Sequence, residues 1–426
     1  MKEGNAMSAA SKESRSTGSR QDILPVLLVG DVSAYALARE FHEAFGISSI
    51  CVIPDPISAI KHSSFISVHT VPNMEPESLA KAIDELGRAH EDKKLIVMAN
   101  SDKAVVALEG IKDAFPSNVI CPLPPHELVD RVSDKIQFAE LCEQYGLHAP
   151  HSEIVSFADD APIAPSQIPF PLIAKPASSA AFEPLFRGRG GFKKVYFMRE
   201  QAELDQLWEE LREAGFKGDF LVQELIEGDD TYVDMITIYI DSTGHATMFA
   251  GAQVLLEDHA PTLFGNPVAM ITRPMPELWE KVAHMLTDIG WRGFANFDLK
   301  RDPKTGKPIF MDFNPRIGRN SYYAVTGGVN PMKALVSDLV DGEHDRVLKT
   351  DREAIYALAP ASMVRRYVVD PALRAEFDGL VRTGKVSNPM RYSGDSLRSR
   401  LDGLMMEKNY IRKFARDYPE PTDTAF

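Results

Sequence analysis

Apolar positions begin to repeat regularly at Ile23. Residues 23–30 read ILPVLLVG, a short apolar run that ends in glycine, and residues 33–45 then carry apolar side chains at helical spacing. This pattern predicts a buried strand, a tight turn and a helix. The unit recurs in SSICVIP with a helix over residues 77–90, and in LIVMA with a helix over residues 103–114. Alternating strands and helices predict a doubly wound parallel sheet over residues 22–132, with ligands expected at the carboxyl ends of its strands.

The pattern changes at Ser133, which can cap the helix predicted by SDKIQFAELCEQYGL. A proline-rich linker covers residues 149–171. It is followed by the apolar strand PFPLIAKP, a glycine-rich segment, a helix over residues 201–214 and the strand FLVQELIEG. Strands with a helix packed on one side predict a small α+β lobe over about residues 170–230.

A third region, residues 231–345, is rich in strand patterns. It contains YVDMITIYI and HATMFAGAQVLL, a helix over residues 277–289, and the sequence ANFDLKRDPKTGKPIFMDFNPR over residues 295–316. The turn PKTGK predicts that the last of these is an antiparallel hairpin. We expect residues 133–345 to form one domain of two lobes, and residues 346–426 to form a mainly helical C-terminal extension.

The chain has 426 residues, of which 44% are hydrophobic and 25% charged, as in ordinary globular proteins. Its 47 Lys and Arg against 61 Asp and Glu give a net charge of −14. A polyanion is a poor candidate for binding nucleic acid or acidic membranes, so we expect no nucleic-acid partner, although a local basic cleft could hold phosphates. Residues 1–21 have little to bury and read as a disordered tail.

The three cysteines, Cys51, Cys121 and Cys142, lie far apart in the sequence and predict neither a disulfide framework nor a zinc site. No apolar run approaches the roughly 18 residues that a membrane span needs, and the N-terminus lacks the apolar core of a secretory signal. We therefore expect a cytoplasmic protein without an integral membrane segment. The sequence leaves its oligomeric state open.

The hairpin carries the clearest chemical signal. Side chains alternate along a strand, so Asp312, Asn314 and Arg316 should project from one face, and the partner strand can bring Asp298 beside them. Carboxylate and amide oxygens suit Mg²⁺, which binds through few protein ligands and substrate phosphates. The alternative is a solvated hairpin whose acids face water.

Two lysines stand where a charge is costly. Lys175 lies in the apolar strand LIAKP, and Lys135 lies in the first turn of a predicted helix, where the helix dipole disfavours a cation. An anionic ligand would explain both positions. The alternative is that each side chain extends to solvent.

Two further segments are candidates for nucleotide contacts. The loop RGRGG, which includes Gly190 and Gly191, offers free backbone N–H groups and positive charge to a polyphosphate, or is merely flexible surface. The strand that ends in QELI leaves main-chain groups free to pair with a flat base edge. Asp230, just beyond, could accept hydrogen bonds from ribose hydroxyls or cap the next turn.

Taken together and in this order, these residues resemble the ATP-grasp superfamily. The resemblance covers roughly residues 135–331 and extends into the preceding α/β domain, which implies an ATP-grasp fold of mixed α/β and α+β class. DFNPRIGRNSYYAVTGGVNP is particularly similar to a stretch of carbamoyl-phosphate synthetase, except that Asp312 stands where most members carry Glu. The shorter Asp side chain would bridge two magnesium ions less well.

A closer resemblance, over nearly the whole chain, is to the D-aspartate ligases of peptidoglycan synthesis. It rests on PFPLIAKPASS, QELIEGDD, LLEDHAPT, GFANFDLKRDPKTG and GKVSNP, together with the N-terminal unit. The resemblance implies an enzyme that uses ATP and Mg²⁺, with two ions expected and Mn²⁺ as an alternative, to activate a carboxylate and join it to an amine. In those ligases the amine is the lysine side chain of a nucleotide-linked cell-wall precursor, and ADP and phosphate are released.

The resemblance also implies roles for individual residues. The ATP site would comprise Lys135, Lys175, Gln223, Glu224, Leu225, Ile226, Asp230, Gly190 and Gly191. The metal ligands would be Asp298, Asp312 and Asn314, and the catalytic residues Arg316, Arg319 and Lys175.

Three other interpretations stay open. A ligase for a different amino acid fits the same residues. An enzyme that activates bicarbonate, like carbamoyl-phosphate synthetase or biotin carboxylase, is disfavoured because the chain holds one copy of the motif set and its N-terminal segment matches the other branch. A regulatory module that binds ATP without catalysis would not need both lysines and all the metal ligands.

Overall fold

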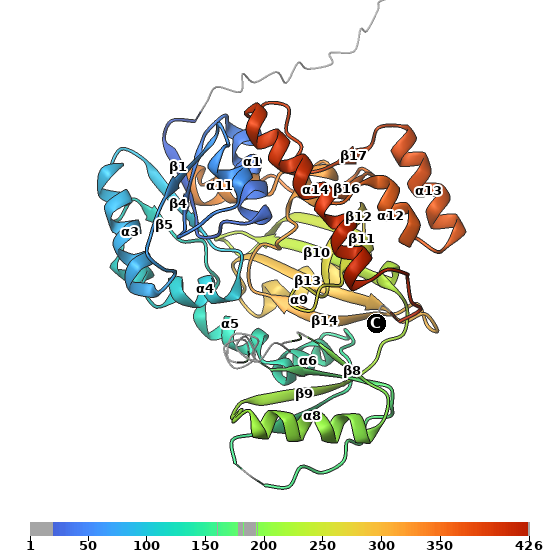
Figure 1. Cartoon of the computed structure of the whole chain (residues 1–426). Coiled ribbons are helices and arrows are strands. Elements are labelled where there is room, and N and C mark those ends of the chain that lie inside the picture. The colour runs from blue at the N-terminus through green and yellow to red at the C-terminus, as the bar shows by residue number, and fades with distance from the viewer. Residues whose placement is uncertain (1–19, 160, 178–181, 183–192, 194, 425–426) are drawn as a thin grey trace, which may run out of the picture.

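The computed structural model of the chain describes residues 20–159, 161–177, 182, 193 and 195–424 (Figure 1). The N-terminal part is a parallel five-stranded sheet in the order β3-β2-β1-β4-β5. Its strands are β1 (Ile23–Leu27), β2 (Ser49–Val52), β3 (Ile66–His69), β4 (Lys94–Met98) and β5 (Val119–Ile120). The helical segments between them are α1 (Val32–Phe45), α2 (Ser58–Lys61), α3 (Pro76–Ala89), α4 (Asp102–Glu109) and η1 (Lys112–Ala114).

Both faces of this sheet are covered. Every residue of β1 is buried. Ile23 and Leu27 pack in one core with α1, whereas Leu24 and Val26 point the other way and pack with α3 and α4. Strands buried on both faces explain why the sequence shows unbroken apolar runs here, and the predicted doubly wound sheet is confirmed.

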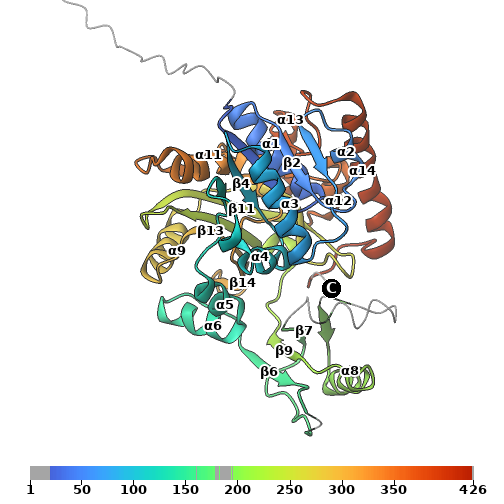
Figure 2. The ribbon, with the colours of Figure 1, turned by 90° about the vertical axis from the view of Figure 1, so that its left-hand side faces the viewer.

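A small lobe follows, with a four-stranded antiparallel sheet in the order β6-β9-β7-β8 (Figures 1 and 2). Helix α8 covers one face of this sheet, with Leu207 and Trp208 packed against Phe220 and Val222. Its elements are β6 (Ser152–Ser156), β7 (Leu172–Pro176), β8 (Tyr196–Met198), α8 (Gln201–Glu213) and β9 (Asp219–Glu224). The preceding helices, α5 (His126–Ser133) and α6 (Lys135–Gln144), pack instead with Phe297 and Phe313 of the large lobe.

The predicted helix cap at Ser133 is wrong by one residue. Ser133 ends α5, and Asp134 caps α6 by accepting hydrogen bonds from the backbone N–H groups of Ile136 and Gln137 at 3.0 and 2.9 Å. A carboxylate at the N-cap interacts favourably with the helix dipole, which explains why Asp134 takes the position. The helix therefore begins at Lys135, which lies in its first turn as predicted.

The large lobe is built on an eight-stranded sheet in the order β14-β13-β10-β11-β12-β16-β17, with β15 paired to β11. The hairpin predicted from PKTGK is confirmed, because β13 and β14 pair antiparallel. The strands are β10 (Val233–Ile240), β11 (Ala246–Asp258), β12 (Asn266–Thr272), β13 (Gly293–Arg301), β14 (Pro308–Asn314), β15 (Leu348–Lys349), β16 (Ile355–Ala357) and β17 (Val386–Ser387).

Helices complete this lobe and the C-terminal part. They are η2 (Asp230–Tyr232), α9 (Pro276–Asp288), α10 (Tyr322–Thr326), α11 (Pro331–Val336), the π-helical turn η3 (Ser337–Asp341), α12 (Ala361–Tyr367), α13 (Pro371–Arg382) and α14 (Leu397–Asp417). The C-terminal part is helical as expected, but it also contributes β15, β16 and β17 to the large sheet. Among the described residues, no helix is both long and apolar enough to cross a membrane.

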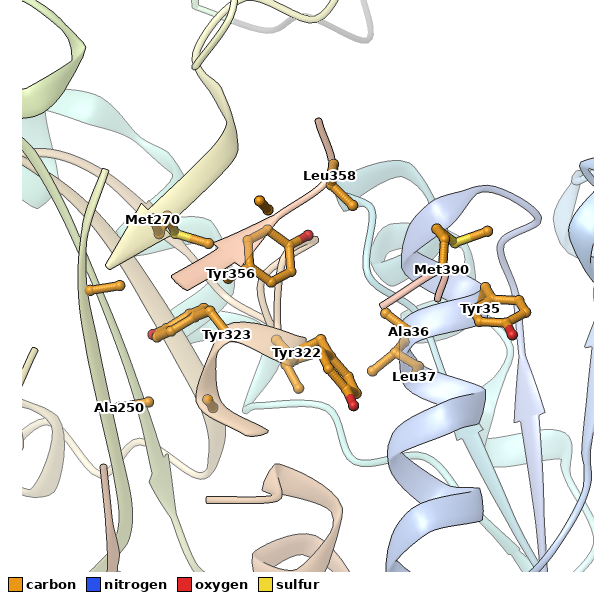
Figure 3. Close-up of a cluster of buried hydrophobic side chains, with 14 of the residues drawn as sticks. Tyr35, Ala36, Leu37, Ala250, Met270, Tyr322, Tyr323, Tyr356, Leu358 and Met390 are labelled. Carbon is orange, nitrogen blue, oxygen red and sulfur yellow. The ribbon is translucent and has the colours of Figure 1, made fainter. Parts of the chain in front are cut away.

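One hydrophobic core joins the N-terminal sheet to the large lobe (Figure 3). Tyr323 lies toward the strand that carries Ala250, while Tyr322 lies toward Leu37 on α1. The Ser321 hydroxyl donates a 2.6 Å hydrogen bond to the Glu40 carboxyl group on α1. These contacts hold the segment after β14 against the N-terminal domain.

Candidate active site

The paired strands β13 and β14 bring the predicted metal ligands together. Asp298 lies opposite Asp312, and Asn296 lies opposite Asn314 in the antiparallel register. The Asn314 amide donates a hydrogen bond to Asp298 Oδ2 at 3.0 Å. Two carboxylates and one amide therefore share one face at the edge of the large sheet.

Both candidate lysines point at this face from other elements. Lys135, the first residue of α6, forms an ion pair with Asp312, and Lys175 Nζ on β7 lies 4.0 Å from Asp312 Oδ2. Each lysine side chain is largely buried, whereas that of Asp312 is partly exposed. Three segments distant in sequence thus bring two cations and the carboxylates to one place.

Arg316 lies just beyond the end of β14, and its guanidinium turns back toward the same face. It donates a hydrogen bond to Asn314 Oδ1 at 3.2 Å and one to the carbonyl of Ile317 at 3.2 Å. Arg316 also lines a small cavity with Met98 and Ala99, at the carboxyl end of β4. The guanidinium therefore lies between the face with Asp298, Asp312 and Asn314 and the N-terminal sheet.

Gly318 allows the loop that carries Arg316 to pass close to Asn296 on β13. A Cβ at position 318 would lie 2.6 Å from Asn296 Oδ1, so a larger residue would displace either the loop or Asn296. Asn296 is fixed in turn, because the Thr237 hydroxyl donates to Asn296 Oδ1 at 2.8 Å. The glycine in the sequence NPRIG is thus needed for the loop that carries Arg316 to pass over β13.

Arg319 has different surroundings. Its guanidinium lies 2.6 Å from Asp31 Oδ2, and Asp31 is the residue that caps α1 in the N-terminal domain. Arg319 lines a second cavity together with Asp258 and Tyr410. The structure therefore places Arg319 at the boundary between the N-terminal domain, the large sheet and α14.

The donor set suits magnesium. Among the described residues, no three His, Cys, Asp or Glu side chains lie close enough to hold a metal by themselves. A cation at Asp298 and Asp312 would need the Asn314 oxygen and ligands from outside the protein. Mg²⁺ is usually bound in this way, through one or two carboxylates with water and substrate phosphates.

The QELI segment ends strand β9. Gln223 is buried and its amide donates to Ser152 Oγ at 3.0 Å, while Glu224 Oε1 accepts from the His151 backbone N–H at 2.9 Å. These bonds fix the strand to the start of β6. Leu225 and Ile226 follow as irregular, half-buried chain, and their contact with an adenine base stays a prediction.

Asp230 is buried. Its Oδ2 accepts from the Glu257 backbone N–H at 2.8 Å and lies 2.9 Å from His259 Nε2. Its Oδ1 is buried and has no hydrogen-bond partner among the described residues. The predicted ribose contact is not tested by these bonds and stays a prediction.

Sequence reasoning missed Lys300, which is buried in β13 two residues after Asp298 and so on the same face. Burial lowers the pKa of Lys300, while Glu257 and Asp230 oppose that shift. The sequence pattern that could have identified Lys300 is a lysine at the end of the largely apolar run ANFDLK, the same kind of pattern that identified Lys175. Gly190 and Gly191 lie outside the described residues, so the role of their loop stays a prediction.

The fold of this chain is similar to that of solved structures. It resembles the biotin carboxylase domain of 2-oxoglutarate carboxylase from Hydrogenobacter thermophilus, with a TM-score of 0.57 and 14% identity, covering 78% of this chain and 73% of that one. It also resembles the L-amino acid ligase from Bacillus licheniformis, with a TM-score of 0.50 and 17% identity, covering 76% and 77% of the two chains. The chain has the ATP-grasp fold that the resemblance implied.

A sequence relative is similar over almost its full length. The D-aspartate ligase of Enterococcus faecium (strain Aus0004) is 25% identical over an alignment of 415 positions, which covers 93% of this chain and 97% of the relative. No family model matches the chain. The resemblance to D-aspartate ligases is therefore confirmed at modest identity, and the substrates are a separate question.

Proposed function

We propose that this protein joins D-aspartate to the lysine side-chain amine of a nucleotide-linked peptidoglycan precursor in the cytoplasm, at the expense of ATP. One observation carries the proposal. Lys135, Lys175 and Arg316 converge on the face with Asp298, Asp312 and Asn314, in a chain that is similar to a D-aspartate ligase over 93% of its length.

The chemistry requires activation of the carboxylate. A carboxylate resists attack by an amine because it is negatively charged and offers only oxide as a leaving group. A carboxylate oxygen would therefore attack the γ-phosphorus of ATP, and the bond from that phosphorus to the β–γ bridging oxygen would break, releasing ADP. The amine would then attack the acyl phosphate carbonyl, lose a proton, and expel inorganic phosphate.

Protein side chains would supply charge and position. Lys135 and Lys175 would neutralise the α- and β-phosphates, and Asp298, Asp312 and Asn314 would hold the magnesium ions that polarise the β- and γ-phosphates. We propose two ions, with Mn²⁺ as an alternative. The partly exposed Asp312 carboxylate beside both lysines supports this arrangement, because it places cations and metal ligands within reach of one phosphate chain.

Arg316 would act on the charge that develops during reaction. Its hydrogen bond to Asn314 keeps the guanidinium beside the metal-ligand face, where it could stabilise the transferred phosphoryl group and then the tetrahedral oxyanion. A preorganised donor of this kind contributes about 3 kcal/mol to transition-state stabilisation. Arg319, held by Asp31 at the domain boundary, is the second residue proposed for this role. The loop with Gly190 and Gly191 would exclude water from the acyl phosphate.

The experiment is phosphate release from ATP with purified protein, measured with D-Asp, L-Asp and a panel of other amino acids, each with and without a lysine-containing nucleotide precursor. We expect release only when D-Asp and the precursor are both present, with ADP and phosphate as products. Asp312→Asn serves as the inactive control.

Each component of the proposal has its own contrary result. AMP and pyrophosphate would overturn the acyl-phosphate mechanism. A signal with a different amino acid would overturn D-Asp while keeping the ligase. ATP binding without hydrolysis under any combination would indicate a non-catalytic module.

A further inference from the structure

Helix α14 exposes a stripe of large apolar side chains. Leu397, Leu401, Leu404, Met405 and Ile411 are 74%, 60%, 36%, 56% and 50% exposed. Their spacing places them on one face of the helix, while the opposite face is packed against the protein through residues that include Ser399, Gly403 and Phe414. Exposed apolar side chains gathered on one face usually mark an interaction site.

The charges on the same face are all positive. Its exposed charged residues are Arg398, Arg400, Lys408, Arg412 and Arg416. The acids within the helix point elsewhere: Asp402 is buried and pairs with His62, and Glu407 is buried and pairs with Arg391. Asp417, at the last position of the helix, pairs with Arg416. We call these five apolar and five basic residues the α14 face.

The α14 face is open to its surroundings. Helix α14 crosses the front of the molecule in Figure 1 and lies along one edge in the perpendicular view of Figure 2. The net charge of the chain is −14, so a face with five cations, of which Arg416 is paired with Asp417, departs sharply from the protein average. Electrostatic screening limits charge effects to about 8 Å at physiological salt, so the local face decides what binds there.

We propose that the α14 face docks the protein reversibly onto an anionic lipid surface. Helices that lie in a membrane interface combine an apolar stripe with Lys and Arg: the apolar side chains enter the boundary between headgroups and acyl chains, and the cations pair with anionic headgroups. The α14 face has both features on one 21-residue helix. This inference goes beyond the proposed ligase activity and does not depend on it.

A second copy of the chain fits the face less well. A twofold interface places the same patch of each copy against the other, so the five cations of one copy would meet those of its partner. Nucleic acid would satisfy the cations but leave the apolar stripe unused. An anionic lipid surface satisfies both.

The test is co-flotation of the full-length protein with vesicles. We expect binding to vesicles of phosphatidylglycerol mixed with phosphatidylcholine, weak binding to phosphatidylcholine alone, and release by high salt. Leu401→Ser/Met405→Ser removes apolar side chains and Lys408→Glu/Arg412→Glu reverses two charges. Lys408→Glu/Arg412→Glu should weaken binding at least tenfold, because each basic residue near an anionic surface contributes roughly a fivefold gain in affinity. Leu401→Ser/Met405→Ser should weaken binding by a similar factor, because two apolar side chains no longer enter the membrane interface.

A matched control reverses two cations elsewhere. Lys81→Glu/Arg88→Glu makes the same charge change on α3, where the two side chains are 79% and 70% exposed, and should bind as the unmodified protein does. Unchanged melting temperatures would show that all variants fold. The proposal is overturned if the unmodified protein does not float with anionic vesicles, if the control loses binding equally, or if Leu401→Ser/Met405→Ser abolishes a dimer in sedimentation while lipid binding is absent.

Discussion

Glu40 offers a quantitative test of how the N-terminal domain is joined to the large lobe. Its side chain on α1 is fully buried, and one oxygen accepts the 2.6 Å hydrogen bond from Ser321. The other oxygen is buried without a partner among the described residues. Burial raises the pKa of Glu40 from 4.5 to about 8, because the ionised form would lose its hydration.

The substitution Glu40→Gln keeps the shape and the acceptor oxygen but is neutral at every pH. Between pH 4.5 and 8 the folded protein holds a proton on Glu40 that the unfolded chain releases, so the stability of the unmodified protein falls as pH rises through this window. At about 1.4 kcal/mol per pH unit, the loss at pH 7 is on the order of 3 kcal/mol. Glu40→Gln should remove that loss.

The assay is thermal unfolding of both proteins at a series of pH values. The melting temperature of Glu40→Gln should equal that of the unmodified protein near pH 4 and exceed it increasingly toward pH 8. Glu85→Gln, an exposed acid on α3, is the matched control and should show no such trend. A difference that is constant with pH, or a Glu40→Gln protein that is less stable at pH 8, would refute the burial argument.

Three further predictions concern the site and the thiols. Asp312→Asn or Asn314→Ala should reduce phosphate release at least roughly a hundredfold with the fold intact, since each removes a proposed magnesium ligand. Near-normal turnover at limiting Mg²⁺ would contradict the metal assignment. Arg316→Ala should lower turnover roughly a hundredfold with little change in ATP affinity. Arg316→Lys should not restore turnover, because an ammonium group cannot form the two parallel hydrogen bonds of a guanidinium. A large loss of ATP affinity with normal turnover at saturation would contradict the catalytic role of Arg316. Burial raises the pKa of Cys51 and Cys142 to about 12, so both thiols should react slowly with a disulfide reagent at pH 8 until the protein unfolds, and fast reaction in the native protein would contradict their burial.

Short-range sequence patterns were sufficient to predict many of the residues that the structure brings together at the candidate site. The alternation of side chains and the PKTGK turn predicted that Asp298 and Asp312 would lie on paired strands, and the register places them directly opposite each other. The costly positions of Lys135 and Lys175 were also visible in the sequence, because helix position and apolar surroundings are short-range properties. These features depend on backbone geometry within a few residues.

Tertiary packing decided the rest. That both lysines meet Asp312, and that Arg319 pairs with Asp31, follows from the way the N-terminal sheet, the small lobe and the large lobe pack together and not from any local pattern. The short strands β15, β16 and β17 have two or three residues each, too few for a periodicity to be recognised. The sequence thus determined the elements and the chemical groups that they carry. The partner of each charged side chain was decided by the packing of distant segments, because a charge that is buried away from water must be paired.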